Sequence, residues 1–124
     1  MFKNLSPGAI GIRGLSLAES IELAKKTGFA GIDFSIREAA DLVDEHDVEY
    51  VRELFSSADI LPGQWGLPVT WNKDEEQWKQ GLEELPQLAA LGRKLGCTRT
   101  ATWCPPASSD RDFDENYTWH ANRF

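Results

Sequence analysis

The chain has 124 residues, of which 41% are hydrophobic and 27% charged, and this composition is typical of one globular domain and excludes a disordered polymer. Its 13 Lys and Arg against 20 Asp and Glu leave a net charge of −7, which disfavours nucleic acid and anionic membranes as partners. No apolar run reaches the roughly 18 residues of a membrane span, and residues 1–16 lack a signal-peptide pattern, so the sequence predicts a cytoplasmic protein.

The first predicted unit is a strand, a helix and a second strand. The apolar run Ala9–Ile12 has strand length, and Ser16 with Glu19 forms the capping-box pattern that begins a helix. That helix is expected to end at Gly28, where a left-handed residue suits the C-terminus. A short run of β-forming residues, Gly31–Phe34, then predicts the next strand and completes a βαβ unit.

The rest of the chain repeats this alternation. The predicted elements are, in order, a helix capped by Asp47, a strand at Ile60–Leu67, a helix at Asp74–Leu95, a strand at Thr98–Trp103 and a helix capped by Asp112. Pro86 lacks an N–H and is expected to kink or divide the helix that contains it. The acidic run from Glu38 to Asp47 has no metal-binding spacing and is interpreted as a solvated loop. Cys97 and Cys104 are expected to be buried, reduced thiols.

Strands that alternate with helices, without hairpin signals, predict a parallel sheet built from right-handed βαβ units. The glycines after the first predicted strand, Gly8, Gly11 and Gly14, do not form a dinucleotide or phosphate-binding loop, which favours a barrel over a nucleotide-binding sheet. A complete (β/α)8 barrel needs about 250 residues. The predicted fold is therefore α/β, with residues 1–124 as the amino-terminal half of a TIM barrel, encoded by a truncated or split gene or representing a fragment.

Candidate site residues are those at the carboxyl ends of the predicted strands, where barrels carry their function. They are Arg13, Asp33, Ser35, Gln64, Trp65 and Trp103, with His120 at the start of the last helix. Asp33 is either a substrate contact or a carboxylate that holds a neighbouring loop. Trp65 and Trp103 are either flat faces for the C–H side of a sugar or ordinary core residues. His120 is a base, a hydrogen-bond donor or a surface histidine, and no complete catalytic motif accompanies it.

Three stretches carry a resemblance to a known family: Gly28–Asp33, which reads GFAGID; Leu85–Cys97; and Trp103–Pro106 followed by Tyr117–Arg123. Together they resemble the sugar phosphate isomerases and epimerases of the xylose isomerase-like TIM-barrel superfamily. The resemblance implies a divalent-metal enzyme, with Mg, Mn or Zn, that moves a proton next to a sugar carbonyl. In such relatives the metal ligands come mainly from strands five to eight, so no metal ligand is assigned to this chain.

The resemblance implies that this chain supplies walls of a substrate pocket for a small sugar or polyol. Asp33, Trp65, Trp103 and His120 are the substrate-binding candidates, and the chain alone is expected to be inactive without a complementing carboxy-terminal half. Two alternatives stay open: a non-catalytic half barrel that binds a polyol or associates with itself, and a lyase of the inosose dehydratase kind. Neither histidine falls at a predicted strand end, which together with the charge of −7 argues against the endonuclease branch and a DNA substrate.

Overall fold

The structure is a computed structural model that describes residues 1–72 and 74–124. Its sheet contains β1 (Asn4–Leu5), β2 (Gly31–Phe34), β3 (Leu61–Gly66) and β4 (Thr100–Ala101). The helices are η1 (Gly8–Ile10), α1 (Leu17–Lys26), α2 (Ile36–Glu45), α3 (Val48–Ala58), α4 (Glu75–Lys94) and α5 (Phe113–Ala121). All neighbouring strands pair in parallel and in chain order, which confirms the predicted α/β fold of successive βα units.

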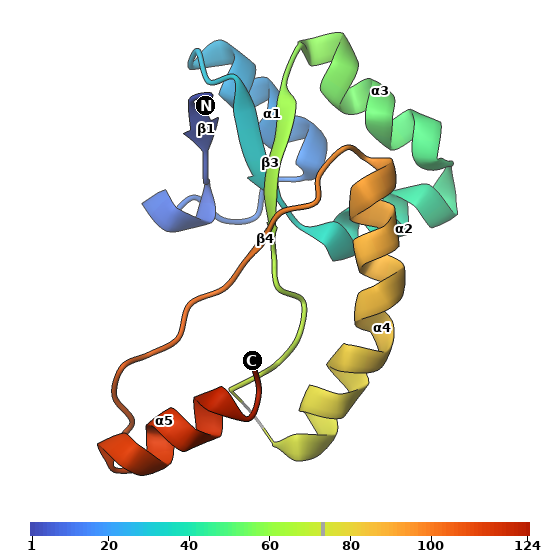
Figure 1. The fold of residues 1–124 in the computed structure, drawn as a ribbon. Helices are drawn as coiled ribbons and strands as arrows, with labels where there is room; N and C mark the ends of the chain where they lie inside the picture. Colours follow the sequence, from blue (N-terminus) through green and yellow to red (C-terminus); the bar gives the residue numbers. More distant parts are fainter. Residues whose placement is uncertain (73) are drawn as a thin grey trace.

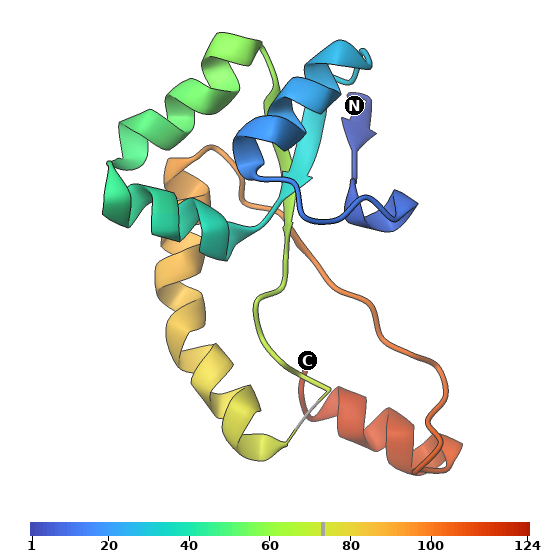
Figure 2. The ribbon, with the colours of Figure 1, turned by 180° about the vertical axis from the view of Figure 1, so that it is seen from behind.

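The helices cover one face of the sheet. Figures 1 and 2 show α1, α2 and α3 on that face, while no helix of the described residues crosses the other, which we call the open face. The core lies between sheet and helices, where Ile32 and Phe34 of β2 meet α1 and α3 and the ring of Phe34 packs edge-on against Phe55 at 5.5 Å. Leu5 joins this core from β1. The side chain of Asp33, which lies between Ile32 and Phe34 in β2, therefore belongs to the open face.

The predicted helix caps are confirmed. Ser16 accepts a hydrogen bond from the backbone N–H of Glu19, whose carboxylate accepts the Ser16 N–H in return, and this capping box begins α1. Gly28, at φ 71°, follows the end of that helix. Asp47 and Asp112 cap α3 and α5 in the same way, each with its carboxylate on the N–H of the third helical residue.

The first strand lies upstream of its predicted position. Asn4–Leu5 forms β1, whereas Ala9–Ile12 falls on the 3-10 helix η1 and the turn that follows it. The reason is the turn after β1: Pro7 begins a tight helical turn, and Gly11, at φ 81°, closes it in the left-handed region. Ile10, the apolar residue that suggested a strand, is 64% exposed.

Two helices also differ from prediction. The acidic run is not a loop, because Ser35 accepts the N–H of Glu38 and begins α2. Pro86 does not divide α4, which continues from Glu75 to Lys94. Pro86 and Leu82 both lie on the exposed side, so water can bond the Leu82 carbonyl that the missing proline N–H leaves free.

A β-bulge interrupts the pairing of β2 and β3. Ile32 pairs with Pro62 and Phe34 with Trp65, so two residues of β3, Gly63 and Gln64, stand opposite Asp33. The extra residue reverses the alternation of side chains along β3. Trp65 consequently shares the core face with Phe34, while Gln64 shares the open face with Asp33.

The remaining differences are small. The last strand, β4, is two residues long and ends at Ala101, before Trp103. Cys97 is buried as expected, but Cys104 is exposed because it follows β4 on a loop, and both cysteines are free. Within residues 1–72 and 74–124, no helix has both the length and the apolar character that crossing a bilayer requires.

Candidate functional site

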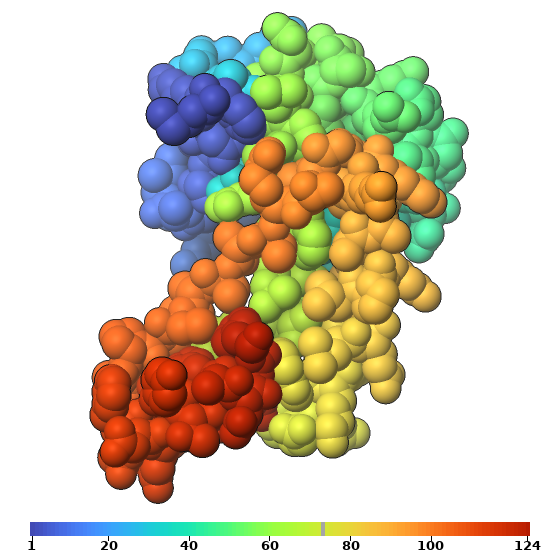
Figure 3. All heavy atoms as spheres, viewed as in Figure 1, coloured from blue at the N-terminus to red at the C-terminus, as the bar shows by residue number. Residues whose placement is uncertain are grey.

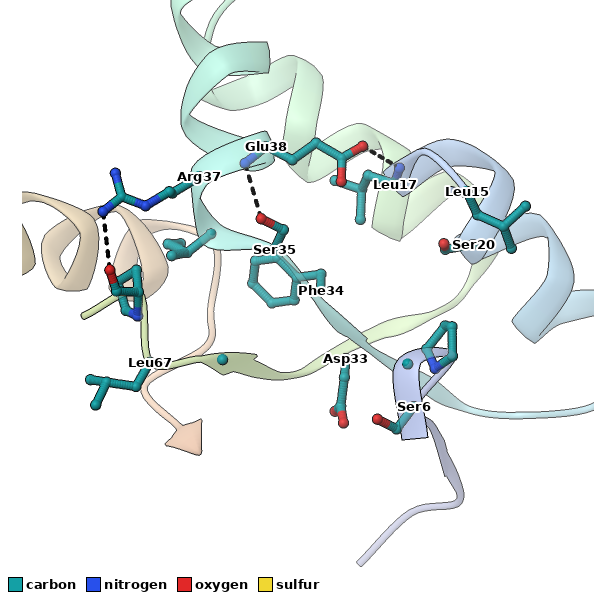
Figure 4. Close-up of a pocket in the computed structure, with 15 residues that line it drawn as sticks. Ser6, Leu15, Leu17, Ser20, Asp33, Phe34, Ser35, Arg37, Glu38 and Leu67 are labelled. Atoms are coloured by element: carbon teal, nitrogen blue, oxygen red, sulfur yellow. Dashed lines mark hydrogen bonds between the residues drawn. The ribbon is translucent and has the colours of Figure 1, made fainter. Parts of the chain in front are cut away.

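A hollow opens at the carboxyl ends of β1, β2 and β3 (Figure 4). Its volume of about 410 Å³ is that of a site for a small ligand. Polar groups reach it from three segments: Ser6 after β1, Asp33 and Ser35 at the end of β2, and Arg37 and Glu38 in the first turn of α2. Figure 4 shows Ser6 and Asp33 side by side at its edge. We call this space the strand-end hollow.

Asp33 is held in place by two amides. Its Oδ1 accepts a hydrogen bond from Asn4 Nδ2 and its Oδ2 accepts one from Gln64 Nε2 at 3.1 Å. Asn4 reaches across the sheet because Gly31 and Gly63 have no Cβ, and a Cβ on either glycine would collide with the Asn4 side chain. The bulge brings Gln64 to the same face. The carboxylate of Asp33 therefore has a defined direction at the edge of the strand-end hollow.

The other charged groups of the hollow already have partners. The Glu38 carboxylate accepts the backbone N–H of Leu17 at 2.6 Å, at the N-terminus of α1. The Arg37 guanidinium donates to Glu84 at 2.6 Å and to the Pro68 carbonyl at 3.0 Å, so it ties α2 to α4 and to the segment after β3. These contacts fix the rim, and among the ionised groups that line the hollow they leave Asp33 without a charged partner in the described structure.

Trp65 does not line the strand-end hollow. It is 3% exposed, and its Nε1–H donates to the Cys97 carbonyl at 3.4 Å. Gly92 of α4 packs directly against its indole. Trp65 pairs with Thr100 of β4, and Trp103 lies three residues beyond Thr100, so the two tryptophans are not register partners. The structure therefore does not bring the two tryptophans to one surface, because the bulge turns Trp65 into the core.

Trp103 and His120 meet in a separate group around Trp71, beyond the ends of β3 and β4. We call it the aromatic cluster: Trp71, Trp103, Trp119, His120 and Phe124, with each of the other four rings 5.2–6.0 Å from the Trp71 ring. Trp103 meets Trp71 edge-on and is 68% exposed. His120 Nε2 lies 3.2 Å from the Pro105 carbonyl oxygen, and its Nδ1 is buried without a hydrogen-bond partner in the described structure.

Arg123 ties this cluster to the beginning of α4. Its guanidinium lies over the rings of Trp119 at 4.4 Å and Trp78 at 5.4 Å, and it donates to the Trp71 carbonyl at 3.0 Å. It also pairs with Glu75 at 3.2 Å, while Arg111 lies over the Trp119 ring at 4.3 Å. Figure 3 shows α5 and the loop before it as a lobe at one end of the molecule.

The residues present do not fit a divalent metal site. Within residues 1–72 and 74–124, His, Cys, Asp and Glu side chains nowhere gather in a group of three that could hold a metal ion. Among these residues, Asp33 has no second carboxylate or imidazole beside it in such a group, and His120 turns Nε2 to the Pro105 carbonyl.

Sequence reasoning missed Asn4 and Ser6. It placed the first strand at Ala9–Ile12, so the residues around the true strand were not considered. A signal was available: the polar pair flanks Leu5 directly before Pro7 and Gly8, which are typical of the turn that ends a strand.

Comparison with solved structures places this geometry in a known architecture. A xylose isomerase domain protein from Alicyclobacillus acidocaldarius superposes with a TM-score of 0.77 and 24% identity, over 99% of this chain and 43% of that one. The chain has the fold of half a xylose isomerase-like TIM barrel. A probable 3-DHS dehydratase, AsbF of Bacillus anthracis petrobactin synthesis, superposes on this half barrel with a TM-score of 0.65 and 17% identity, over 99% of this chain and 45% of that protein.

The half barrel thus spans less than half the length of both solved structures. No protein-family profile matches the sequence, and no curated protein does. In barrels of this kind the carboxyl ends of the strands carry the site. The strand-end hollow lies at those ends.

Proposed function

We propose that this half barrel is the substrate-binding wall of a sugar isomerase or epimerase, in which proton transfer next to a sugar carbonyl depends on a divalent metal held outside the described residues. The observation that supports it is the strand-end hollow, where Asp33 is directed by Asn4 and Gln64 beside the Ser6 hydroxyl. A carboxylate and a hydroxyl so placed accept and donate hydrogen bonds to the hydroxyls of a polyol.

On this proposal Asp33 binds and orients substrate rather than ligating the metal. Trp103 offers an exposed flat face from the aromatic cluster, and His120 is kept as a candidate contact from the same cluster. Trp65 contributes by packing α4 against the sheet. The charge of −7 favours a neutral small molecule over nucleic acid as the partner.

The test is binding and turnover by the 124-residue chain. We expect a polyol such as sorbitol to shift the backbone amide resonances around Ser6 and Ser35, and Asp33→Asn to weaken this binding about tenfold by removing a charged acceptor. Asp41→Asn, an exposed carboxylate on α2, serves as the matched control. Isomerisation of a sugar by the chain alone with Mg²⁺ or Mn²⁺ would contradict the assignment of the metal ligands to residues outside it.

A dehydratase-type lyase is the second candidate, favoured by the similarity to the probable dehydratase described above. Fold alone does not separate the two reactions. The two reactions are separated by incubating a polyol ketone with the chain and a complementing carboxy-terminal half. Loss of water produces an enone with ultraviolet absorption, whereas isomerisation does not.

Self-association is the third candidate and belongs to a different class of function. The outer edges of β1 and β4 are unpaired within the described residues, and the open face carries Phe2 and Leu61, which are 36% and 51% exposed. A second copy would cover both edges. Sedimentation velocity decides it, because a clean monomer at high concentration contradicts assembly.

A further inference from the structure

We propose that the strand-end hollow selects an unphosphorylated polyol and discriminates against the corresponding sugar phosphate. This inference rests on the proposed function and narrows its substrate class. The evidence for it is the set of charged side chains around the hollow and the hydrogen-bond or ion-pair partner of each.

Asp33 is a negative charge whose described partners do not neutralise it. Both of its hydrogen-bond donors, Asn4 and Gln64, are neutral amides that direct the carboxylate and leave its charge in place. Each oxygen of an ionised carboxylate accepts two hydrogen bonds, so each keeps one acceptor position beyond its amide. That position suits a ligand hydroxyl, which can donate, and does not suit an ionised phosphate oxygen, which cannot.

The cations near Asp33 are engaged elsewhere. Arg37 lines the hollow, but its guanidinium is taken up by Glu84 and the Pro68 carbonyl. Arg99 lies on the open face beyond the hollow, where its guanidinium donates to the carbonyls of Pro62 and Gly63 at 3.1 and 2.8 Å. Neither guanidinium forms an ion pair with Asp33 in the described structure.

The N-terminus of α1, which borders the hollow, is also occupied. Helix N-termini attract phosphate through their free N–H groups and the positive end of the helix dipole. Here the Glu38 carboxylate takes the Leu17 N–H and the Glu19 carboxylate takes the Ser16 N–H. Two carboxylates therefore occupy this end of α1, which leaves the first turn of α2 as the place in the hollow where a phosphate could bind. A phosphate monoester, with about 1.5–2 negative charges at neutral pH, meets repulsion from them and from Asp33.

The experiment compares sorbitol with sorbitol 6-phosphate, two probes that differ in the phosphate alone, by NMR titration of the 124-residue chain. We expect the dissociation constant of sorbitol 6-phosphate to be at least about tenfold higher than that of sorbitol. In Asp33→Asn this ratio should fall by about threefold or more, because one of the repelling charges is gone, while Asp41→Asn should leave it unchanged. The ratio in the unmodified chain tests the inference even if Asp33→Asn perturbs the fold.

Each outcome decides something. Equal or tighter binding of sorbitol 6-phosphate overturns the inference and leaves the proposed function standing, and shifts at Ile36 and Arg37 would then locate the phosphate at the first turn of α2. A ratio that is high but unchanged in Asp33→Asn overturns the role of Asp33. Failure of sorbitol and of a panel of other polyols to bind overturns the proposed function together with the inference.

Discussion

Replacing Arg123 with alanine should release α5 from the rest of the molecule. The Arg123 side chain is 8% exposed, stacks between Trp78 and Trp119, and donates to the Trp71 carbonyl. A hydrogen bond from a charged group contributes about 1.5–3 kcal/mol, and each cation–π contact contributes about 0.5–1 kcal/mol. The ion pair with Glu75 adds little, because that carboxylate is 62% exposed. The loss amounts to about 3 kcal/mol.

This loss should appear as local opening of α5 rather than as unfolding of the sheet, because Arg123 contacts the aromatic cluster and the start of α4 and not the core. Amide hydrogen exchange is the assay. We expect protection of the α5 amides to fall about a hundredfold, which is the exchange equivalent of about 3 kcal/mol, with the β2 and β3 amides unchanged. Tryptophan emission should shift to longer wavelength as the cluster becomes hydrated.

Two variants serve as controls for Arg123→Ala. Arg111→Ala removes one stacking contact on Trp119 and should reduce α5 protection by less than about tenfold. Arg123→Lys keeps the charge but loses the planar group that fits between two indoles. Its loss of α5 protection should therefore lie between the losses in the two alanine variants. The reasoning is refuted if Arg123→Ala leaves α5 protection within about threefold of the unmodified chain.

Three further results are expected. Gly63→Ala should lower the free energy of unfolding by about 1–3 kcal/mol in urea titrations, because its Cβ would overlap the asparagine side chain from β1, whereas Gly66→Ala, with open space around it, should not. The hydrogen bonds of the capping box lower the pKa of Glu19 below its ordinary 4.5. The stabilisation of α1 by Glu19 is therefore fully present above that pH and is lost as the pH falls through the lower pKa of the folded state. The urea midpoint of Glu19→Gln should lack this acid dependence. A thiol reagent should modify the exposed Cys104 in the native chain and should modify the buried Cys97 only after the chain is unfolded.

Local signals predicted the helices that begin with a cap. Ser16, Asp47 and Asp112 each bond to a residue three positions further on, so the sequence contains both partners of the interaction. Gly31–Phe34 was predicted for a similar reason, since its length and flanking residues are typical of a strand. The fold class followed from the alternation of these elements.

The site could be predicted in part. Asp33 does border the strand-end hollow, but its partners Asn4 and Gln64 come from strands that pair with β2 over long distances in sequence. A two-residue strand such as β1 has too few residues to show a period of two. The core position of Trp65, one of the two alternatives that the sequence left open, depends on the bulge and so on the register between β2 and β3, which no pattern within β3 alone reveals.

The bulge in β3 lets two segments of one strand keep different pairings. The pairing of Pro62 with Ile32 fixes the first segment, the pairing of Trp65 with Phe34 fixes the second, and the extra residue between them allows both pairings at once. A chain that lacked one of the two residues opposite Asp33 would lose the bulge and keep Trp65 on the helix side, whereas the same residues without a bulge would turn Trp65 toward the mouth of the barrel. The number of residues between Pro62 and Trp65 therefore sets the local twist of the sheet beside Asp33.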